Sequence, residues 1–220
     1  MTLKTLEGLQ VAIQRDLAWR KKELVELRIS ATQSEESRGY LYRAGLVLLC
    51  AHWEGFLRGS IEHYNGHVFA QSLRLRELLP VFVAQAIFAD VLKAGQSDSP
   101  GSEKTQLRLA KRIQQGLDVV ANHSQWKVRT ESNPGSGVVT KLLKSVGLND
   151  QLGLDAATWS TTKVFIDEQV VADRHRVAHG DGFPVTKAEF LERSARLISL
   201  LDQLAAQVIS AAEQRAYRLP

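Results

Sequence analysis

The sequence predicts an all-α protein, and three features of its pattern support this fold class. Apolar residues recur at spacings of three, four and seven along most of the 220 residues, as they do on one face of a helix. Long segments with this spacing lie near both ends of the chain, over residues 3–30, 40–69 and 187–212. No convincing run alternates apolar and polar residues as a strand would. We therefore expect a single domain over residues 1–220, with the long helices packed as a bundle.

The predicted helices have recognisable boundaries. In the first half of the chain they cover residues 3–30, 40–69, 80–95 and 103–122. A polar connector at 31–37 separates the first two, and Ser102 can cap the fourth. The second helix is apolar on so many sides that we place it in the core.

The second half of the chain predicts three more helices after a break at residues 130–137. They cover residues 138–147, 162–179 and 187–212. Gly147 and Gly180 are expected to end the first two, and Ser160 or Thr161 to cap the middle one. Thr186 and Glu189 form a capping box for the last helix, with Val185 and Phe190 at the staple positions around it.

Composition is that of an ordinary globular protein. Apolar residues make up 44% of the chain and charged residues 24%. The longest apolar run, residues 44–51, is too short to span a bilayer, and residues 1–10 lack a secretory signal pattern, so we expect a cytoplasmic protein with no membrane partner. The single cysteine, Cys50, is expected to be a buried, inert thiol. A formal charge of +4 suits a nucleic-acid partner but does not identify one.

The stretch VADRHRVAHGDG, residues 171–182, holds the main candidates for chemistry. In the simplest interpretation Arg174, His175 and Arg176 are a basic last turn that complements the negative end of the helix dipole. This accounts for the arginines better than for His179, which directly precedes the expected stop. Periodicity alone favours this structural interpretation slightly over a functional one.

A zinc site is a second interpretation of the histidines. His175 and His179 are four residues apart and share a helical face, as do His63 and His67. A zinc site needs further ligands, and the sequence has no H-E-x-x-H motif and no paired cysteines. We therefore expect no metal and no cofactor, with His63 and His67 half-exposed on the surface.

Metal-free cleavage of RNA is the third interpretation. RNA supplies its own nucleophile, histidine transfers protons near neutral pH, and arginine binds phosphate with a permanently charged planar fork. Arg174 and His179 lie about 140° apart around an ideal helix. They reach one phosphate only if the helix end unwinds or if two chains contribute to one site.

A second stretch, AHWEGF at residues 51–56, places polar side chains in the apolar second helix. Glu54 there is expected to be paired, because a carboxylate is rarely buried alone. Its candidate partners are Arg43, Arg58, Arg174 and Arg176. Taken by itself, a structural ion pair beside a core Trp53 is the better interpretation.

In combination, AHWEGF and the downstream R-x4-H-G at residues 174–180 resemble the HEPN superfamily of small helical nucleases and nucleotide-binding domains. The resemblance is closest to stand-alone HEPN-like nucleases of bacterial toxin–antitoxin and phage-defence loci, which share a WRKKEL-like segment, here residues 19–24. It covers most of the chain, with residues 72–154 a candidate insertion.

The resemblance implies a homodimer in which both copies of the motif face a shared cleft. Arg174 would stabilise the scissile phosphate, His179 would transfer protons with His175 assisting, and Glu54 would orient one of these groups, with His52 nearby. The products would be a 2′,3′-cyclic phosphate and a 5′-hydroxyl. An antitoxin or other defence-system protein would restrain the enzyme. Candidate RNA-binding residues are Arg176, His52, Trp126 and Lys127.

Three alternatives stay open. Asn is common in this superfamily at the position of His175, so a catalytically silent HEPN module that binds nucleotide or protein is the first. A helical adaptor, whose basic turn is only a helix end, is the second. The third concerns Trp126 beside Lys127 and Arg129, which can stack on and neutralise single-stranded RNA; an anchored surface tryptophan accounts for the pattern equally well.

Overall fold

The computed structural model of the protein describes residues 3–35, 38–95, 103–121, 126–130 and 134–220. All the regular elements within these residues are helices, and the backbone pairing outside them is limited to isolated bridges such as that between Arg74 and Val120. The predicted all-α class is therefore confirmed.

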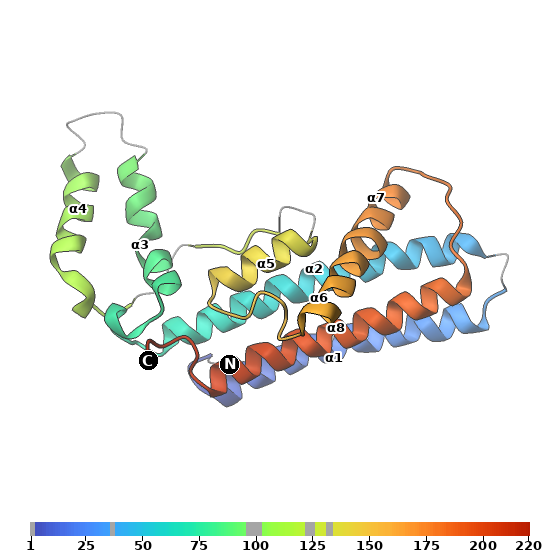
Figure 1. Cartoon of the computed structure of the whole chain (residues 1–220), viewed down its shortest axis with the longest axis horizontal. Coiled ribbons are helices and arrows are strands. Elements are labelled where there is room, and N and C mark those ends of the chain that lie inside the picture. Colours follow the sequence, from blue (N-terminus) through green and yellow to red (C-terminus); the bar gives the residue numbers. More distant parts are fainter. Residues whose placement is uncertain (1–2, 36–37, 96–102, 122–125, 131–133) are drawn as a thin grey trace.

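Three long helices form the body of the molecule (Figure 1). They are α1 (Leu6–Gln33), α2 (Gly39–Ala70) and α8 (Lys187–Glu213), and each packs against the other two. Helices α1 and α8 run antiparallel: Gln10 bonds to Glu213 at one end, at 3.0 Å, and Arg28 donates to the Leu191 carbonyl near the other, at 2.6 Å.

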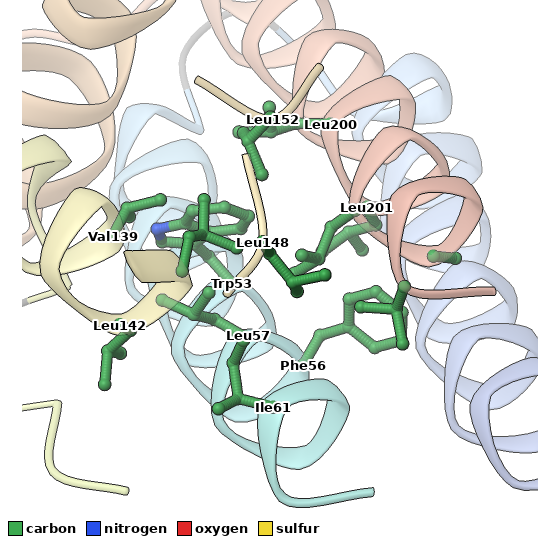
Figure 2. Close-up of a cluster of buried hydrophobic side chains, with 14 of the residues drawn as sticks. Trp53, Phe56, Leu57, Ile61, Val139, Leu142, Leu148, Leu152, Leu200 and Leu201 are labelled. Carbon is green, nitrogen blue, oxygen red and sulfur yellow. The ribbon is translucent and has the colours of Figure 1, made fainter. Parts of the chain in front are cut away.

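The α2–α8 contact depends on a glycine. A Cβ atom at Gly45 would stand 2.4 Å from the ring of Phe190, so a side chain there would push the two helices apart. Further along α2, the core continues with Trp53 and Phe56, which are both 0% exposed. Figure 2 shows these side chains facing leucines of α8 and of the loop that follows α5.

The remaining helices lie along the bundle or extend from it. Their bounds are η1 (Leu75–Glu77), α3 (Pro80–Gly95), α4 (Glu103–Gln114), η2 (Gly116–Asp118), α5 (Ser136–Ser145), α6 (Ala156–Val164), η3 (Phe165–Ala172) and α7 (Asp173–Ala178). Helices α3 and α4 form a hairpin at one end of the bundle, whereas α5, η3 and α7 lie against α2, with α6 leading into η3 (Figure 1).

Several predicted boundaries are confirmed. Gly147 and Gly180 follow α5 and α7 with φ values of +68° and +87°, which favour glycine. The Thr186–Glu189 capping box forms at the start of α8, and the flanking Val185 is buried, as the staple interpretation requires.

Other boundaries differ from the prediction. Helix α1 continues to Gln33, into the expected connector, because Ala31 is completely buried against the bundle. Helix α4 stops at Gln114 instead of continuing to residue 122; Gly116 follows with φ +66°, and the chain then pairs with residues 73–75. Ser102 lies outside the described residues.

The cap of the helix that carries the motif was also predicted wrongly. Helix α6 begins at Ala156, capped by Asp155, which accepts hydrogen bonds from the backbone N–H groups of Ala157 and Thr158 at 2.9 and 3.0 Å. The predicted caps, Ser160 and Thr161, are inside this helix. An aspartate with two backbone donors outcompetes a hydroxyl further along the chain.

The capping box predicts a pH-dependent contribution to stability. Hydrogen bonds from the backbone and side chain of Thr186 lower the pKa of Glu189 below its usual 4.5. Because the folded pKa is depressed, the stabilisation is present above the unfolded pKa and is lost as pH falls through the folded pKa. Glu189→Gln is expected to cost about 0.5 kcal/mol at neutral pH, since this solvated carboxylate acts only at a helix terminus.

Urea unfolding at neutral pH and well below the usual pKa of Glu189 measures this difference. Glu192→Gln, an exposed change one turn later in α8, is the matched control. A Glu189→Gln deficit that stays constant at low pH would contradict the assignment.

Candidate active site

The segment that carries the motif departs from α-helical geometry. Residues Phe165–Ala172 form the π-helix η3, and the N–H of Asp173 bonds to the carbonyl of Glu168, five residues back. π-Turns are rare and often occur at functional sites. The wider turn changes the directions in which the following residues point, so the regular helix predicted over 162–179 was wrong in this respect.

Asp173 anchors α7 to α8. Its carboxylate is 9% exposed and accepts a hydrogen bond from Arg193 of α8 at 2.6 Å and one from Arg176 at 3.4 Å. A buried carboxylate needs such compensation, because removal from water penalises its charge. The pair fixes the first turn of α7.

The next residue, Arg174, is partly buried and lies beside Cys50 of α2. Cys50 is 1% exposed, as predicted. Burial raises the pKa of the Cys50 thiol; the charge of Arg174 and a side-chain hydrogen bond with it act in the opposite direction, and the charge of Glu54 adds to the increase. Arg174 and Glu54 therefore both act on the same buried sulfur atom.

Glu54 is held by a residue that the sequence did not point to. The hydroxyl of Thr130 donates a hydrogen bond to Oε1 of Glu54 at 2.5 Å. The predicted pairing of Glu54 with Arg43, Arg58, Arg174 or Arg176 stays a prediction. Glu54 is thus positioned close to the Arg174 region, and its role in orienting Arg174 or His179 stays a prediction.

The two histidines of the motif stand together on α7. The ring centroids of His175 and His179 are 4.1 Å apart, and both residues are exposed. His179 is the last residue before the turn, which closes by hydrogen bonds from Gly180 to Val177 and from Asp181 to Arg176, at 3.1 and 2.9 Å. This turn holds the His179 backbone in place while its ring faces solvent.

Arg176 is occupied by its neighbours. Its guanidinium lies 3.9 Å from the ring centroid of Phe183 and 3.7 Å from the carboxylate of Asp181, besides its contact with Asp173. The side chain is nevertheless 47% exposed. Its predicted part in RNA binding stays a prediction.

His52 lies apart from these groups. It is two residues from Cys50 on α2, about 200° around the helix, and so faces α1. There its Nε2 is 3.2 Å from Glu23, and its ring is 5.4 Å from that of Trp19. Burial lowers the pKa of His52, partly offset by the charge of Glu23. The structure does not bring His52 to the Arg174 region.

Trp126 and Lys127 lie in a further region, a groove between α3 and α5. Of the second histidine pair, His67 is buried, at 3% exposed, and bonds to the carbonyl of Leu3 at 2.7 Å, so the prediction of a half-exposed residue was wrong. The part of the chain that the structure describes holds no group of three or more His, Cys, Asp or Glu side chains placed to bind a metal ion.

Sequence reasoning missed Asp173, Arg193 and Thr130. Asp173 directly precedes the motif arginine, and this position in an otherwise apolar segment was the available signal. The other two lie far along the chain from the residues they contact, and neither has a local pattern.

Comparison with known families identifies the family of this chain. Residues 9–217 match the family model described as MAE_28990-like HEPN, and the chain therefore belongs to the HEPN superfamily. Membership points to a nuclease-type or RNA-related function. Comparisons with curated proteins and with solved structures gave no match. Within the described residues, every helix is too short or too polar to cross a membrane.

The anchoring role of Asp173 is testable by stability. Asp173→Asn is expected to cost about 3 kcal/mol in the free energy of unfolding, because Arg193 is left buried without its counter-charge. Lys22→Gln, which breaks an ion pair whose side chains are 77% and 63% exposed, is the control, and it should cost no more than about 0.5 kcal/mol. Urea unfolding of the two variants measures both values. Similar costs for both would show that the Asp173 pair anchors nothing.

Proposed function

We propose that this HEPN-family chain is a metal-independent endoribonuclease that works as a homodimer. The observation that carries the proposal is the composition of α7. This six-residue helix and its cap place a partly buried guanidinium, Arg174, within one and a half turns of two adjacent exposed imidazoles, His175 and His179. These are the groups that phosphodiester transfer in RNA requires.

The reaction needs no group beyond these side chains and the RNA itself. One imidazole accepts the proton of the 2′-hydroxyl while O2′ forms a bond to phosphorus. The bond from phosphorus to O5′ breaks, and the second imidazole, in its protonated form, donates a proton to O5′. The products are a 2′,3′-cyclic phosphate and a 5′-hydroxyl. Arg174 stabilises the negative charge that develops on the phosphorane oxygens.

The directions of these side chains support the proposed homodimer. Arg174 lies against α2, whereas His175 and His179 are about 100° and 140° further around α7. A site that takes Arg174 from one chain and the histidines from its partner brings them together without unwinding the helix. A twofold axis would then produce two equal sites.

The biological role that fits such an enzyme is that of a toxin or phage-defence effector. Uncontrolled cleavage of cellular RNA would be lethal, so a partner protein would cover or modify the exposed face of α7. The RNA phosphate and the partner protein would both contact this face, because His175 and His179 are exposed there.

A silent module that binds nucleotide or protein is the second candidate. The observation that favours it is His175, which stands where Asn is common in the superfamily. The two candidates differ in whether the chain cuts RNA.

The first experiment incubates the purified protein with total RNA in excess EDTA, beside Arg174→Ala, His179→Ala and the control His63→Ala, a partly exposed histidine outside the site. We expect the wild type and His63→Ala to cut, and each motif variant to lose at least about a hundredfold in rate, as is usual when a general acid or base is removed. No cleavage by folded wild type would favour the silent module. Equal cleavage by all four would place the activity elsewhere.

A mixing experiment tests the shared site. In a dimer of one Arg174→Ala chain and one His179→Ala chain, one of the two composite sites keeps both groups, whereas a site formed within a single chain keeps only one of them. Random exchange in an equal mixture should therefore restore about a quarter of wild-type activity. Each variant alone should stay inactive. Failure of the mixture to recover, with subunit exchange demonstrated by mass, would rule out the composite site.

A further inference from the structure

We infer that the groove between α3, residues 126–130 and α5 binds single-stranded RNA and guides it toward Arg174. The groove has a volume of about 840 Å³. This inference rests on the proposed function, because it takes RNA as the ligand of the adjacent motif.

The charge of the groove favours a polyanion. Four of its described lining residues are cations that come from all three walls, and none is acidic: Lys93 of α3, Lys127 and Arg129, and Lys141 of α5. All four are exposed. Cations spread over three walls suit successive phosphates of a strand better than the single phosphate cluster of a mononucleotide.

The floor of the groove favours unpaired bases. Trp126 is partly buried there, and two large apolar side chains, Phe88 and Leu92, are 42% and 45% exposed beside it. Aromatic faces between cations are the usual platform for single strands, because every base can stack on them whatever its sequence. Double-stranded RNA keeps its bases stacked on each other and could not use this floor.

The wall formed by residues 127–130 connects the groove to the motif. Burial alternates along it: Lys127 and Arg129 are exposed, and Val128 and Thr130 are buried. The cations line the groove, while the Thr130 hydroxyl bonds to Glu54, which in turn acts on the same thiol as Arg174. A strand bound along this wall is therefore led toward α7.

The test measures binding in the Arg174→Ala, His179→Ala background, so that the RNA is not cut. Fluorescence anisotropy follows a short fluorescein-labelled oligouridine over a series of KCl concentrations. Two double variants remove charge from different walls: Lys127→Gln with Arg129→Gln, and Lys93→Gln with Lys141→Gln. The control, Arg15→Gln with Lys22→Gln, removes two exposed charges from α1.

Each groove variant should reduce the slope of log K against log[KCl] by about 1.4, since each phosphate that a cation neutralises on a single strand contributes about 0.7 to that slope. The control should leave the slope unchanged. Trp126→Ala should weaken binding about tenfold with the slope retained, because it removes stacking but no charge. Because Trp126 is half-buried, the urea midpoint of Trp126→Ala is measured to check that this variant folds. If it does not fold, the charge variants, which change exposed positions, decide whether the groove binds RNA.

Slopes and affinities equal to the control would overturn the inference. So would displacement of the oligouridine from the groove by uridine monophosphate at comparable affinity, which would make the groove a mononucleotide site. Different results would contradict the proposed nuclease function. If the wild type does not cut but the groove variants lose binding, the groove binds RNA although the nuclease function fails. If the same groove substitutions in the catalytically intact chain leave cleavage and its KM unchanged, the nuclease function holds without the groove.

Discussion

The arrangement of the motif depends on the buried ion pair between Asp173 and Arg193. A carboxylate at 9% exposure is tolerated only because two guanidinium groups meet it, and one of them belongs to α8. The pair joins the six-residue helix α7 to α8, one of the three long helices, which Gly45 lets approach α2 at Phe190. Loss of the Asp173–Arg193 pair would weaken the attachment of α7 to α8.

The π-helix η3 explains how one continuous segment serves two requirements. Its apolar residues Phe165, Ile166, Val170 and Val171 must face the core, and Asp167 must reach back to cap α5, where it accepts bonds from the Ser136 N–H and hydroxyl at 2.6 Å. In a regular helix, these core-facing residues would also fix the directions of the motif side chains, because each residue is rotated by the same angle from the one before it. The wider π-turn changes this rotation, so that Asp173 faces α8 and Arg174 faces α2.

Much of the fold could be predicted from the sequence because its signals are local. Gly147, Gly180 and the Thr186–Glu189 box act within one turn of chain, and each was located correctly. The cap at Asp155 was missed because several residues in that stretch can cap a helix, and the sequence pattern does not tell which of them gains the two backbone donors. The family resemblance placed His52 near the motif, and the sequence could not correct this because α2 is apolar on most sides; the structure turns His52 toward Glu23. The bonds of Asp173 to Arg193 and of Thr130 to Glu54 join segments far apart in sequence, where no periodic pattern operates.

The contacts that anchor α7 also make its functional side chains face in different directions. Asp173 and Arg174 are committed to α8 and α2, and a six-residue helix has no room to turn back before Gly180 ends it. The histidines must then face away from the bundle, and a single chain presents its cation and its proton-transfer groups in different directions. Flexibility is a poor remedy, since unwinding α7 would break the buried pair at its start. In the proposed homodimer, a twofold copy of the chain would bring a second surface with a matching cation to this exposed face. The rigidity of α7 is thus an argument for assembly and not against catalysis.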